Sequence, residues 1–183
     1  RDLLGGEVGE VLVEFDRNGS LPTTHDSQGS DMGLFGGLLG WDADDERLPG
    51  SLPTLRERGV KIRIETVDAG DPHPNTYRLT LRRGEERHFV RAISTGGGMM
   101  EVLGVDAFHV SMFGDCFETL LWVRGEGHKL ARELATLVSA DAILVHEAGG
   151  EQLAHDCPSR SIARQPMSRR QKPSGHWIVS TSV

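Results

Sequence analysis

The sequence lacks most of the features that identify common functional classes. It contains only two cysteines, Cys116 and Cys157, which are too few for a disulfide framework and are not spaced as zinc ligands. An iron–sulfur cluster held by this chain alone is not expected, because such clusters need several thiolate ligands. No apolar run approaches the roughly 20 residues that a membrane-spanning helix requires. The net charge of -7 argues against general binding to nucleic acids or membrane surfaces.

The composition that remains is that of a small globular protein. Its 183 residues suit one domain or slightly more, with 37% hydrophobic residues, 5% aromatic residues and 23 glycines. No secretory signal is evident, so we expect a cytoplasmic protein. The chain starts at Arg1 rather than at a methionine, which is compatible with a fragment or a processed start.

Alternating apolar and polar residues predict an α+β fold, with a mostly antiparallel sheet and a few helices on one face. In the clearest run, Val60, Ile62 and Ile64 alternate with charged residues, as in a half-buried strand. The expected strands are 8–15, 60–67, 77–83, 87–93, 99–103 and 107–113, and the expected helices are 33–41 and a second one starting after Pro53.

The chain is expected to have three parts. Residues 1–114 form the main domain. Residues 115–153 form a reduced strand–helix–strand unit, with strands at 119–123 and 142–146 and a helix at 129–138. Residues 154–183 are rich in proline, serine and basic residues, a composition typical of an extended or disordered tail.

Two prolines make the segment around His73 stiff. Pro72 and Pro74 restrict their own φ and push the preceding residues towards extended conformations. Asn75 and Thr76 then add an amide and a hydroxyl just before a strand. These groups can bind a small carboxylate or amino acid, or they can satisfy backbone groups in a rigid turn. The residues alone leave both interpretations open.

A second polar segment, Ser94-Thr95-Gly96-Gly97-Gly98, ends the next expected strand. Three glycines allow positive φ and expose successive backbone N–H groups, which can bind an anion as a nest. The alternative is a bulge or sharp turn between two strands. It is not a phosphate-binding P-loop, because no Gly-Lys-Ser/Thr follows it.

The polar segment 24–31 precedes the glycine-rich helix. It contains a histidine, carboxylates and hydroxyls, which suit either an acid/base pair at a helix N-terminus or a simple N-cap by Ser30 or Asp31. Each cysteine is interpreted as an idle buried thiol, with contact to a partner's metal site as the alternative.

Six motifs occur in an order that resembles one known family. They are Gly19-Ser20, Gly29-Ser30-Asp31, Gly37-Leu38-Leu39-Gly40, Asp44-Asp45-Glu46-Arg47, His73-Pro74-Asn75-Thr76 and Ser94-Thr95-Gly96-Gly97-Gly98. This order resembles the β chain or β domain of the iron–sulfur-dependent L-serine dehydratases. It is also similar to the allosteric substrate-binding domain of some phosphoglycerate dehydrogenases. The resemblance covers about residues 8–114.

The resemblance implies a partner. In the family, an α chain or domain carries a [4Fe–4S] cluster whose open iron acts as a Lewis acid. The reaction removes water from a β-hydroxy amino acid, and the enamine then hydrolyses to a 2-oxo acid and ammonia. The β part packs against the α part and contributes to a closed site, an effector site or both, so we expect a homo- or hetero-oligomer.

This chain departs from the family pattern in three places. Gln28 stands where the family usually has a histidine, which removes a titratable group and indicates a substrate other than serine. The family's N-terminal serine-rich segment is absent, and the tail after Glu151 matches no known part of the family.

The sequence therefore predicts a β-type component of a serine dehydratase-like lyase, with a non-catalytic amino-acid-binding domain as the alternative. His73, Asn75 and Ser30 are the expected catalytic residues, and the cluster is expected on the partner. The expected substrate- or effector-binding residues are Thr76, Asp31, Ser94, Gly96, Gly97 and Gly98.

Overall fold

The computed structural model describes residues 1–114, 118–138 and 140–158, and the chain divides into two compact units. The first unit is Arg1–Asp106 and the second is Ala107–Val183. The expected domain boundary was residue 114, and the expected tail from residue 159 onward lies outside the described residues. Each unit is considered by itself.

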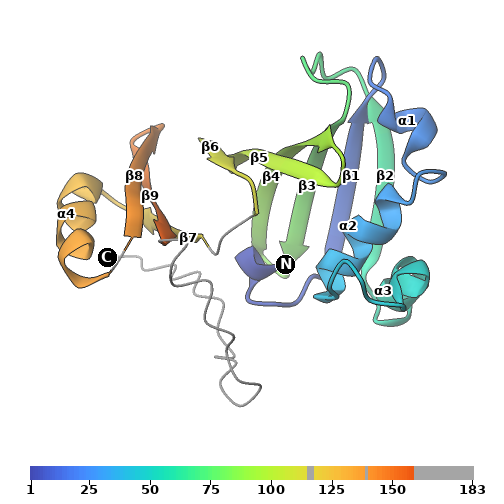
Figure 1. The fold of residues 1–183 in the computed structure, drawn as a ribbon, viewed down its shortest axis with the longest axis horizontal. Coiled ribbons are helices and arrows are strands. Elements are labelled where there is room, and N and C mark those ends of the chain that lie inside the picture. Colours follow the sequence, from blue (N-terminus) through green and yellow to red (C-terminus); the bar gives the residue numbers. More distant parts are fainter. Residues whose placement is uncertain (115–117, 139, 159–183) are drawn as a thin grey trace. The chain divides into compact units, whose positions relative to one another are not determined.

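The first unit contains a twisted sheet in which β1 (Glu10–Asp16) is an interior strand, next to the edge strand β2. Within this unit the hydrogen-bonded order of the strands is β2-β1-β3-β4-β5 (Figure 1). The pair β1–β2 is parallel, whereas β1–β3, β3–β4 and β4–β5 are antiparallel. The other strands of the first unit are β2 (Lys61–Val67), β3 (Thr76–Arg83), β4 (Glu86–Gly96) and β5 (Met99–Val105).

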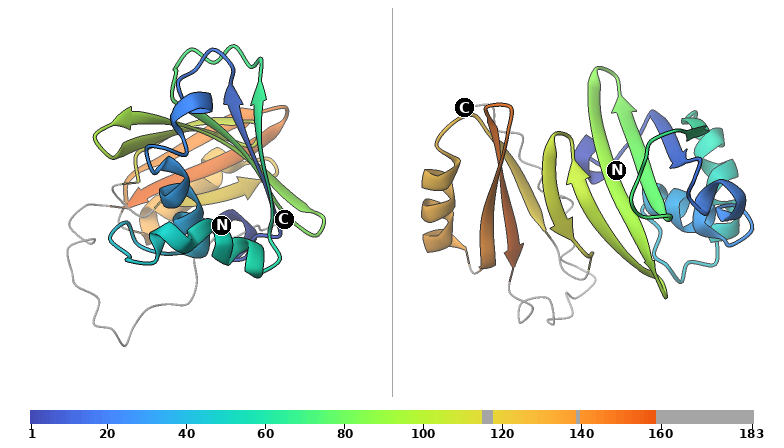
Figure 2. Two further views of the ribbon diagram at one scale, coloured as in Figure 1. Left: turned by 90° about the vertical axis from the view of Figure 1, so that its right-hand side faces the viewer. Right: turned by 90° about the horizontal axis from the view of Figure 1, so that it is seen from above.

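The parallel pair requires a crossover, and the helices supply it. Between β1 and β2 the chain forms α1 (Leu21–Thr24), α2 (Ser30–Leu39), the short 3-10 helix Leu48–Gly50 and α3 (Ser51–Glu57). These helices cover one face of the first unit's sheet (Figure 2). The predicted α+β class, with helices on one face of a mostly antiparallel sheet, is confirmed.

The core of the first unit lies between the helices and this face of the sheet. Val11, Val13 and Phe15 alternate along β1 and are buried, as a strand with one covered face requires. Phe35 on α2 and Leu55 on α3 belong to the same cluster. Gly36 of α2 packs against Leu48, and a Cβ at this position would require the end of the Leu48 side chain to move.

One predicted helix start is wrong. Helix α3 begins at Ser51, before Pro53 rather than after it. Proline is tolerated in the first turn of a helix, where its missing N–H has no intrahelical partner. The buried hydroxyl of Ser51 donates to the Met32 carbonyl of α2 at 3.3 Å and joins the two helices.

The second unit contains the predicted strand–helix–strand sequence and two further strands, β6 and β9. It begins with β6 (Phe108–Met112) and continues with β7 (Thr119–Val123), α4 (Gly127–Leu137), β8 (Ala140–Ala148) and β9 (Glu151–Pro158). The last three strands form an antiparallel sheet in the order β7-β9-β8. The sequence assigned residues 154–158 to the tail, but they pair with β7 and β8 as the second half of β9.

Two histidines lie together inside the second unit. His155 is buried, bonds to Glu118 through Nε2 and stacks on His146 with ring centroids 5.7 Å apart. Burial and the neighbouring His155 both lower the pKa of His146. No helix in the described part of the chain is long and apolar enough to cross a membrane.

A half-buried pair of a histidine and a carboxylate, His88 and Asp106, lies at one end of β4 and β5 in the first unit. Asp106 accepts hydrogen bonds from His88 Nδ1 and from the Phe89 backbone N–H, both at 2.9 Å. The hydrogen bond to Asp106 raises the pKa of His88, and the nearby Glu86 acts in the same direction.

We predict that His88 makes the protein more stable at low pH than at high pH. Because its folded pKa is raised, the contribution is complete below the unfolded value of about 6.5 and is lost as pH rises through the folded pKa. The unfolding midpoint of His88→Gln should therefore approach that of the wild type as pH rises. Denaturant titrations from acidic to alkaline pH measure this, with His128→Gln on an exposed side chain as the control. A constant difference across pH would contradict the assignment.

Candidate functional site

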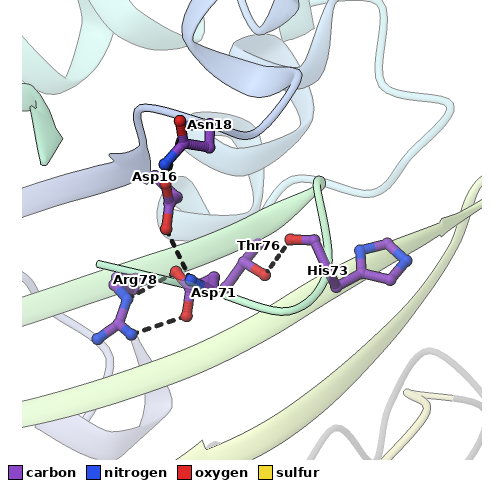
Figure 3. A network of polar contacts seen from close by, with 6 residues as sticks. All are labelled: Asp16, Asn18, Asp71, His73, Thr76 and Arg78. Carbon is purple, nitrogen blue, oxygen red and sulfur yellow. Dashed lines mark hydrogen bonds and ion pairs between the residues drawn. The ribbon is translucent and has the colours of Figure 1, made fainter. Parts of the chain in front are cut away.

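The predicted polar loop is tied to the end of β1 by a buried carboxylate. Asp16, the last residue of β1, is 4% exposed. Its Oδ1 accepts the Asn18 N–H at 2.8 Å, and its Oδ2 accepts the Asp71 N–H at 2.6 Å (Figure 3). These backbone hydrogen bonds hold the pKa of Asp16 below its usual value, with a smaller contribution from the charge of Arg78.

Asp71 continues this network to β3. Its carboxylate accepts two hydrogen bonds from Arg78, at 2.8 Å from Nε and 2.7 Å from Nη2 (Figure 3). The Asp71 side chain is 1% exposed, so the pair is almost wholly shielded from water on its acidic side. A bidentate arginine–carboxylate pair fixes orientation as well as distance. The loop therefore has a defined position relative to β1 and β3.

Inside the loop, the histidine and threonine support the turn. The Asn75 N–H donates to His73 Nδ1 at 3.2 Å, and the Thr76 hydroxyl donates to the His73 carbonyl at 2.7 Å. His73 Nδ1 is therefore the acceptor nitrogen, and Nε2 is the nitrogen that faces away from this turn. The ring projects away from the Asp16 network (Figure 3). Thr76 is buried, and its hydroxyl is used for this hydrogen bond within the loop.

Asn75 connects the loop to two other segments. Its side-chain oxygen accepts a hydrogen bond from the Ser20 hydroxyl, and its Nδ2 donates to the Ser94 carbonyl at 3.4 Å. Two backbone bonds reinforce these contacts: Ser20 N–H to the Pro74 carbonyl at 2.9 Å, and Ser94 N–H to the Asn75 carbonyl at 3.0 Å. The structure thus places Ser94 beside the His-Pro-Asn-Thr motif, from which it is well separated in the sequence.

The three glycines form the turn between β4 and β5. Gly96, Gly97 and Gly98 have φ of 91°, 62° and 78°, and a Cβ on any of them would meet open space. An anion-binding nest typically alternates right- and left-handed residues, whereas these three are all left-handed. The geometry here is that of the sharp turn, which was the alternative interpretation of this segment. Their role in ligand binding stays a prediction.

A second polar cluster forms at the start of α2. Asp31 binds His25 Nδ1 with both carboxylate oxygens, at 2.9 and 2.8 Å. Ser30 bonds to the Tyr77 hydroxyl, and Tyr77 directly follows the His-Pro-Asn-Thr motif. Burial is the main cause that raises the pKa of Tyr77, and the Asp31 charge adds to it. Ser30 and Asp31 are therefore in the same part of the first unit as the loop.

Several residues of this region were not predicted as site residues. Asp16, Asp71 and Arg78 hold the loop, and their contacts cross from one strand to another, which no local pattern reveals. Ser20 had a local signal, because Gly19-Ser20 is one of the family-like motifs. His25 lay in the polar segment considered for an acid/base pair, but the sequence did not show which carboxylate it meets.

Comparison with curated proteins identifies two similar proteins. The chain is 31% identical over 115 residues to the probable L-serine dehydratase β chain of Bacillus subtilis strain 168, covering 63% of this chain and 51% of that protein. It is 31% identical over 112 residues to the L-serine dehydratase β chain of Peptoniphilus asaccharolyticus, covering 60% and 50%.

The resemblance to L-serine dehydratase β chains is confirmed. The chain spans about half the length of the curated relatives it matches. No family model matches the sequence.

We predict that Gly19 is required for the contact between the two loops. A Cβ at Gly19 would lie 2.5 Å from the Pro74 carbonyl oxygen, and backbone on both sides prevents an easy shift. Gly19→Ala should therefore destabilise the first unit by roughly 1–3 kcal/mol. Gly37→Ala is the matched control, because Gly37 lies in α2 with open space around it and alanine favours a helix by up to about 1 kcal/mol. Equal unfolding midpoints for the two variants would refute the contact.

We also predict that the Arg78–Asp71 ion pair contributes much more to the free energy of unfolding than an exposed ion pair does. Arg78→Met leaves the shielded Asp71 carboxylate without its two hydrogen bonds, which should cost about 1–3 kcal/mol. Arg17→Met removes a comparable pair with Asp68, but those side chains are 63% and 75% exposed, so we expect less than about 1 kcal/mol. Chemical unfolding of both variants measures the difference, and a larger effect for Arg17→Met would contradict this ranking.

Proposed function

We propose that this chain is the β-type component of an iron–sulfur-dependent L-serine dehydratase-like lyase. The reaction would remove water from a small β-hydroxy amino acid and, after hydrolysis of the enamine, release a 2-oxo acid and ammonia. The observation that carries this proposal is the similarity to two L-serine dehydratase β chains. It is supported by the direct contacts that the structure makes between Ser20, Asn75 and Ser94, which come from three separate family-like motifs.

The cluster of such an enzyme does not fit this chain. The sequence has only two cysteines; Cys116 lies outside the described residues, and the side chain of Cys157 is not described. Among the described residues, no three histidine, cysteine, aspartate or glutamate side chains are grouped as metal ligands. We therefore assign the [4Fe–4S] cluster to an α-type partner chain or domain, as the resemblance implies.

The contribution proposed for this chain is recognition of the amino acid. His73 offers Nε2 on a loop held in place by Asp16 and Asp71, because its Nδ1 is already used by the Asn75 N–H. Asn75 is itself held between Ser20 and Ser94, so its amide is preorganised. Preorganised polar groups on a rigid loop bind a small ligand with less loss of entropy than mobile ones.

The test is anaerobic reconstitution of the full chain with a cluster-bearing α-type chain. We expect dehydratase activity on L-serine or a related β-hydroxy amino acid only when both chains are present. His73→Ala should reduce this activity by about tenfold or more, because one polar contact to the substrate is lost. His128→Ala is the control, since His128 is exposed on α4 in the other unit.

Two outcomes would contradict the proposal. One is full activity of the α-type chain alone, and the other is a reconstituted complex that His73→Ala leaves unchanged. Amino-acid binding by the full chain that alters no partner's chemistry would favour the effector-binding domain instead. Circular dichroism of each variant shows whether a loss of activity reflects loss of the fold.

A further inference from the structure

The cluster around His25 is built from three separate elements. His25 follows the last residue of α1, Asp31 is in the first turn of α2, and Tyr77 is in β3. The Asp31 N–H also donates to the His25 carbonyl at 3.3 Å, so backbone and side chain join the same two residues. The carboxylate is thereby positioned against His25 Nδ1 and leaves Nε2 on the other edge of the ring.

An aromatic surface fixes the plane of the imidazole. The ring centroids of His25 and Phe15 are 4.9 Å apart, and Phe15 meets the edge of Tyr77 at 5.4 Å. Phe15 is only 1% exposed, so this support belongs to the core. The side chains of His25 and Asp31 keep exposures of 19% and 14%, which leaves them open to a small ligand. The cluster therefore has buried aromatic support on one side and partly exposed polar groups on the other.

The electrostatics of the cluster favour a cation. A histidine that donates its Nδ1 hydrogen to a carboxylate presents an acceptor at Nε2, and the carboxylate adds a full negative charge. Asp31 from α2 bonds to His25, and Tyr77 from β3 lies beside Phe15 and near Asp31; neither side chain carries a positive charge. An amino-acid carboxylate would be repelled here, whereas an ammonium group would be attracted.

We propose that the His25–Asp31 pair binds the ammonium group of a small amino acid. This inference deepens the proposed function and rests on it, because it orients the amino acid in the same site. It also specifies the role of Asp31, which the sequence predicts only as a substrate- or effector-binding residue. Gln28 stands where the family usually has a histidine. It is exposed on the loop between α1 and α2 and does not replace that histidine in the His25–Asp31 cluster.

Calorimetry on the full chain, alone and with its reconstituted partner, tests the proposal with three probes. L-serine carries both charged groups, 2-aminoethanol keeps the amine, and 3-hydroxypropionate keeps the carboxylate. We expect Asp31→Asn to weaken binding of the two amines by about tenfold or more and to leave the third probe unaffected. Asp26→Asn is the matched control, because Asp26 is exposed on the same loop and the change in net charge is the same.

His25→Gln supplies the second readout. It removes the ring that bonds to Asp31, so it should also weaken binding of L-serine and 2-aminoethanol and leave 3-hydroxypropionate unaffected, while circular dichroism shows a retained fold. Unchanged amine binding in Asp31→Asn, equal effects of Asp31→Asn and Asp26→Asn, or no binding of any amine would overturn the proposal. Dehydratase activity together with intact amine binding in both Asp31→Asn and His25→Gln would contradict this inference but not the proposed function. Amine binding that depends on Asp31, without any dehydratase activity, would support this inference and contradict the proposed function.

Discussion

The arrangement of the candidate site depends on the buried carboxylate of Asp16. A carboxylate has two oxygens that accept hydrogen bonds, and here the backbone N–H groups of Asn18 and Asp71, from two different segments, each bond to one of them. One of these segments is the turn that continues β1, and the other is the loop that carries His73. This acceptor joins the loop directly to the end of β1. The contacts of Asn75 with Ser20 and Ser94 hold the same loop at its other end.

The loop that carries His73 is also positioned by close backbone packing, which involves no charged group. The Gly19 backbone lies so close to the Pro74 carbonyl that a side chain does not fit between them. The family-like Gly-Ser dipeptide thus has a physical meaning: glycine permits the approach, and serine then bonds to the opposite loop through both its N–H and its hydroxyl. Charge pairing at Asp71 and close approach at Gly19 position the loop from two sides.

Much of the fold could be predicted, because the pattern of the first unit is local. Alternation identified the strands, and the glycine-rich helix was recognisable from its apolar run even though glycine disfavours helices. The strand β9 was missed because its second half lies in a stretch whose prolines and basic residues resemble a tail. The site was only partly predictable: His73, Asn75 and Ser94 were found by motif order, whereas the pairing of His25 with Asp31 requires knowing how the loop between α1 and α2 closes.

The position of β1 in the sheet also has a consequence for how the protein acquires its fold. Both neighbours of β1, at Lys61–Val67 and Thr76–Arg83, are distant from it in the chain, and the chain must complete the whole helical crossover before either can pair. Contacts of such long sequence separation slow folding, because the entropy of closing the intervening loop is lost before the contacts form. On a ribosome, β1 would therefore emerge long before its partners. The polar loop, which lies between those two late strands, would be among the last parts of the first unit to take its native conformation.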